Sequence, residues 1–300
     1  MILCLGEAIV DLVCEEEVDS IGDAESFAPH FGGALANVAV AAAREGAEVE
    51  LAGGVGDDHW GRWLRDRLAA EGVGRRWFSL VPGLKTPLAF ITFGPDGEPS
   101  YIVYGDGIEA GLASVGDRAA EAASGAGALV FGSNTLVSEA ERSVTLAARE
   151  AALDAGSAVV FDPNLREHRW SDPAHATELC RKMCDGATVV RTNRPEAMRI
   201  AGLAEDADPR EAATAIHELG AAAAVVTLGG EGAVSAGPLE LRVPAQEVRV
   251  VSSLGAGDAF LGAMCAVLDR RRWDLTALAE ATDAGVAAGA RACRSWGAVA

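Results

Sequence analysis

The sequence predicts an α/β protein, in which a mostly parallel β-sheet is covered by helices on both faces. Short runs rich in Val, Ile and Leu alternate with Ala-rich segments of helical spacing, as parallel sheets with crossover helices require. Of the 300 residues, 50% are hydrophobic, which is enough to fill one large core. The chain contains no low-complexity tract, linker or internal repeat, so we expect a single domain over residues 1–300.

The central strands are expected where the apolar runs are short. In chain order they cover residues 1–5, 48–52, 129–132, 158–162, 188–191 and 223–228. Helices are expected between them, at residues 34–45, 59–71, 138–155, 209–219, 256–270 and 275–294. Several of these helices end at a glycine, which can adopt the left-handed conformation that stops a helix: Gly46, Gly72, Gly156 and Gly220.

Four β-rich segments interrupt this alternation and predict a separate small sheet. They cover residues 10–14, 27–31, 87–93 and 100–104, and the run at residues 94–97 (Gly-Pro-Asp-Gly) is typical of a hairpin turn. We place these segments over the mouth of the main sheet and call this layer the lid. It takes about residues 10–31 and 86–106 from within the same domain.

The charge of the chain excludes several classes of partner. There are 25 Lys and Arg against 44 Asp and Glu, a formal net charge of −19, which repels nucleic acids and anionic membranes. No apolar run approaches the roughly 20 residues that cross a bilayer, and the N-terminus lacks the basic start of a signal peptide. Six cysteines without a CxxC pair predict reduced, mostly buried thiols. We therefore expect a cytoplasmic protein that binds a small molecule.

The run Gly255-Ala256-Gly257-Asp258 is the strongest candidate for chemistry. A predicted strand at residues 250–251 leads into a Gly-Ala-Gly turn and then a helix, so N–H groups at the helix start can converge on an anion. Asp258 stands beside that anion site, where it can accept a proton from an attacking hydroxyl. A glycine-rich turn followed by an Asp that stabilises the helix dipole fits the same residues.

Two further segments suit a polyhydroxylated ligand. Gly32 and Gly33 precede a predicted helix, and Asn37 lies one turn into it with both a donor and an acceptor to offer. Asp11 interrupts an apolar strand, where its carboxylate can accept two sugar hydroxyls. A glycine-rich helix entry with a solvated Asn, and an ordinary turn Asp, are the alternatives.

Several common enzyme classes lack their motifs in this chain. Its two lysines, Lys85 and Lys182, stand outside any GxxxxGK[ST] motif, which excludes a Walker-type NTPase. The absence of a GxGxxG after the first strand argues against a dinucleotide-binding dehydrogenase. The five histidines show no metal-ligand spacing, and there is no GxSxG motif.

Seven short motifs, none of them specific alone, are spread over nearly the whole chain. In order they are GEAIVD (6–11), GGALANVA (32–39), GGVGDDHWG (53–61), FDPNLR (161–166), NRPE (193–196), TLGGEG (227–232) and GAGD (255–258). In this order and at these spacings they resemble the ribokinase-like (PfkB) family of carbohydrate kinases. Residues 162–166 with Trp170 are most similar to the fructokinase branch.

The resemblance implies a ribokinase-like three-layer α/β/α core with a β-sheet lid, and ATP-dependent phosphorylation of a sugar hydroxyl. Asp258 would be the catalytic base, and the N–H groups of Gly255, Ala256 and Gly257 would hold the transferring phosphoryl group. The implied substrate contacts are Asp11, Gly32, Gly33, Asn37, Tyr104 and Arg166. The implied nucleotide contacts are Asn193, Glu196, Thr227, Gly229 and Gly232, with Glu196 also organising Mg²⁺ through water.

Fructose is the substrate that this resemblance favours. Its alternatives within the family are 2-keto-3-deoxygluconate, ribose or a nucleoside, and an alternative of another class is a non-catalytic sugar or nucleotide sensor. ATP and Mg²⁺ are the implied cofactors. Relatives hold a monovalent cation with an Asp and a following Thr where this chain has Ser252, Ser253 and Leu254, so K⁺ activation stays open. A lid with a free edge is compatible with a homodimer through the lid and equally with a monomer.

Overall fold

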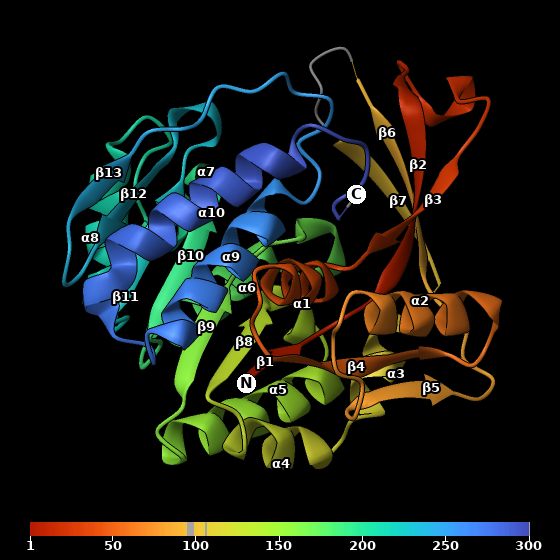
Figure 1. The fold of residues 1–300 in the computed structure, drawn as a ribbon, viewed down its shortest axis with the longest axis horizontal. Helices are drawn as coiled ribbons and strands as arrows, with labels where there is room; N and C mark the ends of the chain where they lie inside the picture. The colour runs from red at the N-terminus through yellow and green to blue at the C-terminus, as the bar shows by residue number, and fades with distance from the viewer. Residues whose placement is uncertain (95–98, 106, 300) are drawn as a thin grey trace.

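The computed structural model describes residues 1–94, 99–105 and 107–299, and its strands form two sheets (Figure 1). The strands are β1 (Ile2–Leu5), β2 (Ile9–Glu17), β3 (Ala28–Gly32), β4 (Val49–Gly56), β5 (Phe78–Val81), β6 (Leu88–Phe93), β7 (Pro99–Tyr104), β8 (Ala128–Gly132), β9 (Ala158–Asp162), β10 (Val189–Asn193), β11 (Ala223–Thr227), β12 (Ala233–Ala236) and β13 (Leu241–Val243). The α-helices are α1 (Ala34–Arg44), α2 (His59–Ala70), α3 (Gly107–Ala113), α4 (Arg118–Ser124), α5 (Glu139–Asp154), α6 (Pro173–Cys184), α7 (Arg194–Ala201), α8 (Pro209–Glu218), α9 (Ala256–Arg270) and α10 (Leu278–Ala292).

The main sheet has nine strands in the order β13-β12-β11-β10-β9-β8-β1-β4-β5. The strands from β11 to β5 run parallel, and β12 and β13 add an antiparallel edge. Each of the six predicted central strands is present in it, which confirms the mostly parallel α/β class. Because the parallel strands share one direction, their carboxyl ends meet at the same edge of the sheet, where ligands of open α/β sheets bind.

Helices cover both faces of the main sheet, so the protein has three layers (Figure 1). Alternate residues of β1 show this division: Leu3 and Leu5 belong to the hydrophobic core that includes α4, α5, α6 and α8, whereas Ile2 and Cys4 belong to the core that includes α1, α2, α9 and α10. A strand that is buried on both faces has to be apolar throughout, which explains why the central strands lack polar alternation.

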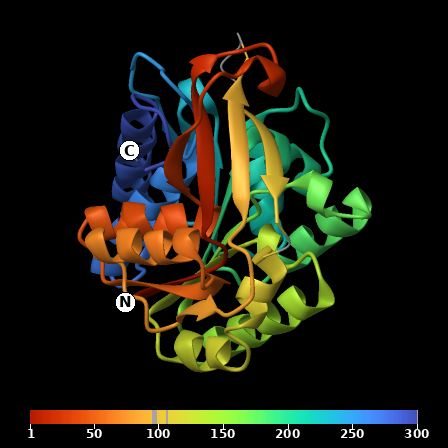
Figure 2. The same ribbon diagram turned by 90° about the vertical axis from the view of Figure 1, so that its right-hand side faces the viewer.

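The four-stranded sheet has the order β3-β2-β6-β7 and stands at one side of the layered core (Figure 2). Strands β2 and β6 are parallel, and each also pairs with an antiparallel partner, β3 and β7 respectively. This confirms the prediction of a second, small sheet beside the main one. From Pro95 onward the predicted turn at residues 94–97 lies outside the described residues, as does Asp106.

Some expectations about single elements were wrong. The segment that precedes Gly255 is not a strand, because the N–H of Val251 donates to the carbonyl of Cys293 and not to a sheet neighbour. Strand β4 continues through Gly53 and Gly54 to Gly56, where glycine composition hides the strand. The prediction also missed β5, β12, β13 and the helices α3, α4, α6 and α7, most of which are short.

Two further predictions concern the state of the cysteines and the presence of membrane-spanning segments. Five of the six cysteines are buried and Cys293 is half-buried, and none is in a disulfide. Burial raises the pKa of the thiols of Cys4, Cys180 and Cys184, which keeps them protonated and unreactive. Among the helices of the described part of the chain, none combines the length and apolar composition needed to cross a bilayer.

Candidate active site

The turn before α9 leaves backbone donors without acceptors. Gly255 has φ +72°, and a Cβ atom there would lie 2.3 Å from Cβ of Ala298, so this position requires glycine twice over. The N–H of Ala256 donates to the carbonyl of Ser253 at 3.2 Å. Within the described residues, the N–H groups of Gly255 and Gly257 have no such acceptor. Of the three N–H groups predicted for an anion, two are therefore unengaged at the positive end of a helix.

Asp258 and Asn37 meet although 221 positions separate them in the sequence. Asn37 Nδ2 donates to Asp258 Oδ2 over 2.9 Å, across the junction of α1 and α9. Burial raises the pKa of Asp258 to about 6, and the hydrogen bond from Asn37 acts against this rise because it stabilises the carboxylate. Asp258 is thus mostly ionised at neutral pH, as a general base has to be, and its proton affinity is higher than that of an exposed Asp.

Asp11 projects from β2 and packs directly on Gly32 in the neighbouring strand β3. A Cβ atom on Gly32 would lie 2.3 Å from the carboxyl carbon of Asp11, so a larger residue there would displace this carboxyl group. Burial is the main reason that the pKa of Asp11 rises to about 8; the charge of Asp258 adds to the effect, and that of Arg166 opposes it. In the free protein Asp11 therefore carries its proton at neutral pH and presents one donor beside its acceptors, instead of the two acceptor oxygens of a carboxylate.

These groups line one cavity of about 260 Å³. Of the predicted site residues, it is lined by Asp11, Gly33, Asn37, Arg166, Asn193, Gly255, Gly257 and Asp258. Its walls come from the carboxyl ends of β9 and β10, the beginnings of α1 and α9, and the small sheet, which contributes Ile9, Ala89, Tyr101 and Val103. The order of strands in the main sheet thus brings together motifs that are far apart in the chain.

Tyr104 does not line this cavity, unlike Tyr101 and Val103 of the same strand. Its side chain is 58% exposed and packs edge-on against Phe90, with 5.5 Å between ring centroids. Successive residues of a strand point to opposite faces, so Tyr101 and Tyr104 lie on different sides of β7. The guanidinium of Arg166 lies 5.6 Å from the centroid of the Tyr101 ring, which makes Tyr101 the aromatic wall of the cavity.

Asn193 and Glu196 form a capping box at the start of α7. The Asn193 side chain accepts the N–H of Glu196 at 2.9 Å, and Glu196 Oε2 accepts the N–H of Asn193 at 3.1 Å. Glu196 Oε1 accepts the N–H of Leu165 at 2.8 Å. Both carboxylate oxygens therefore already bind backbone, which suits an outer position around a metal better than direct ligation. Burial and the charge of Asp162 raise the pKa of Glu196, against the effect of Arg191.

Thr227, Gly229 and Gly232 lie outside the cavity, at the turn between β11 and β12. Thr227 is paired with Asn193 in the β10–β11 register, so this turn continues the same edge of the sheet beyond Asn193. Gly229 and Gly232 have φ +57° and +97°, which only glycine adopts without strain. The described residues contain no group of three or more His, Cys, Asp or Glu side chains that could hold a metal.

The buried ion pair of Arg191 and Asp162, beneath the Gly255 turn, was not predicted from the sequence. Arg191 donates to Asp162 Oδ2 at 3.0 Å and to Thr227 Oγ1 at 2.8 Å, and it also lines the cavity. A Cβ atom on Gly257 would lie 2.6 Å from Arg191 Nη2, so the guanidinium supports the turn from below. The sequence feature that could have indicated this pair is Arg191, a single charged residue in the apolar strand predicted at residues 188–191.

Comparison with known proteins agrees with this arrangement. The chain matches the pfkB family carbohydrate kinases over residues 1–300. It is 32% identical over 265 residues to fructokinase-1 of Oryza sativa, which covers 88% of this chain and 81% of the rice protein.

Two solved structures superpose over almost the full length. Aminoimidazole riboside kinase from Salmonella enterica, complexed with aminoimidazole riboside and an ATP analogue, has a TM-score of 0.82 at 28% identity, covering 99% of this chain and 95% of that one. Fructokinase from Vibrio cholerae, bound to fructose, ADP and calcium, has a TM-score of 0.83 at 27% identity, covering 99% and 94%. Given the family match over its whole length, the chain belongs to the pfkB family of carbohydrate kinases.

Proposed function

We propose that this protein transfers the γ-phosphoryl group of ATP to a hydroxyl of a small carbohydrate, with fructose as the leading substrate. The observation that carries the proposal is the position of Asp258: a carboxylate held by Asn37 on the wall of a cavity that also exposes the N–H groups of Gly255 and Gly257. A base next to an anion-binding turn is what phosphoryl transfer to an alcohol needs.

In this mechanism the acceptor hydroxyl lies against Asp258, which takes its proton as the bond to the γ-phosphorus forms and the bond from that phosphorus to the departing ADP breaks. The N–H groups of Gly255 and Gly257 stabilise negative charge on the transferring group, and Arg191 beneath the turn adds a fixed positive charge. The lid, with Tyr101 and Val103 facing the cavity, excludes water that would otherwise compete as the acceptor.

Mg²⁺ would neutralise the charge of the nucleotide phosphates. Glu196, whose two oxygens already accept backbone N–H groups, fits a water-mediated contact to that ion, and Asn193, Thr227, Gly229 and Gly232 would border the nucleotide. Ser252 Oγ accepts the N–H of Leu254 at 3.1 Å. The activity assay with and without K⁺ tests whether this ion activates the protein. We expect the reaction in the cytoplasm, where the buried thiols stay reduced.

A riboside is the second candidate substrate, because the aminoimidazole riboside kinase fold matches this chain as fully as the fructokinase fold does. The discriminating experiment measures ADP release with Mg²⁺, with and without K⁺, over fructose, ribose, aminoimidazole riboside, adenosine and 2-keto-3-deoxygluconate. Saturable turnover that is highest with fructose supports the proposal. Turnover that is highest with another compound of the panel supports a kinase with a different substrate. ATP binding without turnover of any compound indicates a non-catalytic sensor.

Asp258→Asn provides the mechanistic arm of that experiment. We expect kcat to fall by roughly 10²- to 10⁴-fold while sugar and ATP still bind, because only proton acceptance is lost. Binding is followed by calorimetry with the variant. Near-normal turnover would remove Asp258 from the role of base.

A further inference from the structure

Three buried hydrogen-bond acceptors, on residues that line the cavity, have no donor among the described residues. They are Glu7 Oε2, Asn37 Oδ1 and Asn134 Oδ1, and their residues are 7%, 4% and 7% exposed. A buried acceptor left without a donor costs about 1–3 kcal/mol, so such atoms in a ligand cavity indicate what the ligand has to supply. Asn37 already belongs to the proposed base assembly, which leaves Glu7 and Asn134 without an assigned role.

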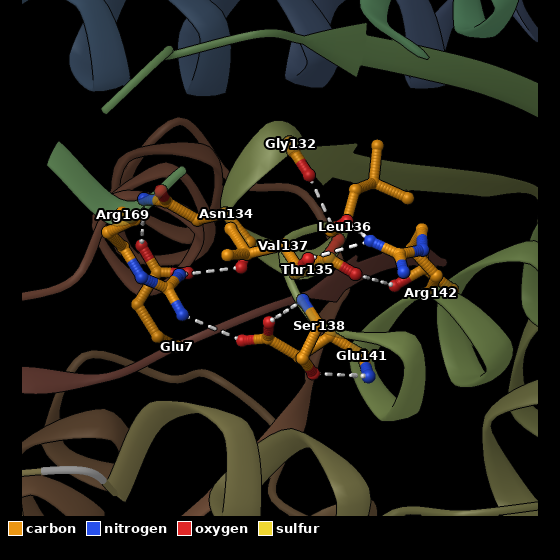
Figure 3. A network of polar contacts seen from close by, with 11 residues as sticks. Glu7, Gly132, Asn134, Thr135, Leu136, Val137, Ser138, Glu141, Arg142 and Arg169 are labelled. Carbon is orange, nitrogen blue, oxygen red and sulfur yellow. Dashed lines mark hydrogen bonds and ion pairs between the residues drawn. The ribbon is translucent and has the colours of Figure 1, made fainter. Parts of the chain in front are cut away.

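The Glu7 carboxylate is held through one oxygen, and the other has no donor among the described residues. Its Oε1 accepts the N–H of Ala34 at 3.2 Å, at the start of α1, and the Asn134 Nδ2 group at 3.3 Å. Figure 3 shows Glu7 beside Asn134. Because Asn134 uses its NH₂ group on Glu7, its carbonyl oxygen is the atom that remains for a ligand.

The backbone of Asn134 is held by the half-buried Arg169, which is paired with the buried Glu141. Arg169 Nη1 donates to the backbone oxygen of Asn134 at 2.7 Å, and its Nη2 donates to Glu141 Oε1 at 2.8 Å (Figure 3). The other oxygen of Glu141 accepts the N–H of Ser138 at 2.8 Å, within the capping box of α5. The Asn134 turn is thus fixed by α5 and by the segment after β9 before any ligand arrives.

We infer that Glu7 and Asn134 form a hydroxyl-recognising subsite for the acceptor substrate, an inference that rests on the function proposed above. A substrate hydroxyl there donates its proton to Glu7 Oε2 or Asn134 Oδ1, and two adjacent hydroxyls serve both. A carboxylate at this position would offer no proton to either acceptor. The part of the substrate that reaches this subsite is therefore a neutral, hydroxyl-bearing sugar or riboside moiety.

The test compares Asn134→Leu with Ser133→Ala, using the best acceptor found in the panel. Leu has the same branched side-chain skeleton as Asn, is somewhat bulkier, and lacks its acceptor. Ser133 is also buried, and its hydroxyl has no partner among the described residues, but it does not line the cavity. For Asn134→Leu we expect KM for the sugar to rise about 10- to 100-fold with KM for ATP within about twofold. Ser133→Ala should leave both constants within about twofold.

Single-deoxy analogues of the same acceptor identify the hydroxyl. The analogue that lacks the hydroxyl bound at this subsite should be a poor substrate for the wild type. The wild type and Asn134→Leu should use this analogue equally well, because the contact between that hydroxyl and Asn134 is missing in both cases. Glu7→Gln, which keeps the shape, should also reduce this discrimination and serves if Asn134→Leu does not fold.

The outcomes separate the two claims. Absence of wild-type turnover with every acceptor overturns the proposed function. Wild-type turnover with unchanged sugar KM and unchanged deoxy discrimination in both variants overturns the subsite while the kinase stands.

Discussion

The hydrogen bond from Asn37 to Asp258 should be visible in the pH dependence of the reaction. The pKa of Asp258 is about 6, so kcat/KM of the wild type should have its acid midpoint at about pH 6. Between pH 5 and pH 7 the ionised fraction of such a group rises about tenfold, which is the expected gain in rate. This midpoint is far above that of an exposed Asp, because burial destabilises the carboxylate.

The perturbation is Asn37→Leu, which removes the donor at 2.9 Å and keeps the branched shape of the side chain. A hydrogen bond to a charged group contributes about 1.5–3 kcal/mol, and one pKa unit corresponds to about 1.4 kcal/mol, so the midpoint should rise by about 1–2 units. The assay is kcat/KM from pH 5 to pH 9 in a buffer of constant ionic strength, with the acceptor selected from the panel.

Asp11→Asn is the matched control. It also removes a predicted sugar contact, but Asp11, with a pKa of about 8, is already neutral near pH 6. Its replacement should therefore lower the height of the profile and leave the acid midpoint at about 6. If Asn37→Leu lowers the height and the midpoint stays where it is in the wild type, Asp258 is not the group that titrates, and the reasoning from this hydrogen bond fails.

Three further predictions concern stability and the charges beneath the site. Folded Asp11 keeps a proton that the unfolded chain releases near pH 4, so its burial costs stability as the pH rises from about 4 to 8. Between pH 5 and pH 8, the free energy of unfolding of Asp11→Asn should increase by on the order of 3 kcal/mol relative to that of the wild type. Urea melts in which this difference does not change with pH contradict the prediction. Gly255→Ala should lower the melting temperature more than Gly46→Ala, because both have positive φ but only Gly255 also meets Ala298; equal losses in calorimetry would mean that the contact relaxes. Asp162→Asn leaves Arg191 buried without its carboxylate, which should cost about 3–5 kcal/mol. The charge of Asp162 raises the pKa of Asp258, so that variant should also move the acid midpoint of kcat/KM below pH 6. A higher midpoint would show instead that the loss of Asp162 acts by displacing Arg191.

The sequence alone determined the fold class and the positions of most central elements. The apolar run of β1 and the Ala-rich pattern of α9 are local signals, and each specifies an element whatever the rest of the chain does. The second sheet was recognisable for the same reason. Elements that are short or rich in glycine, such as β12 and the end of β4, carry too few side chains for a periodic signal, and only their neighbours in the sheet make them strands.

The chemistry of the site was decided by tertiary structure. The motif around Asp258 could be recognised from its order of residues, but its hydrogen bond to Asn37 joins segments 221 positions apart, and the Glu7–Asn134 contact spans 127. Which aromatic residue faces the cavity was decided by the pleat of β7, which turns Tyr101 inward and Tyr104 outward. The pKa values of Asp11 and Asp258 depend on burial and on charges brought close by folding, and residue order along the chain contains neither quantity.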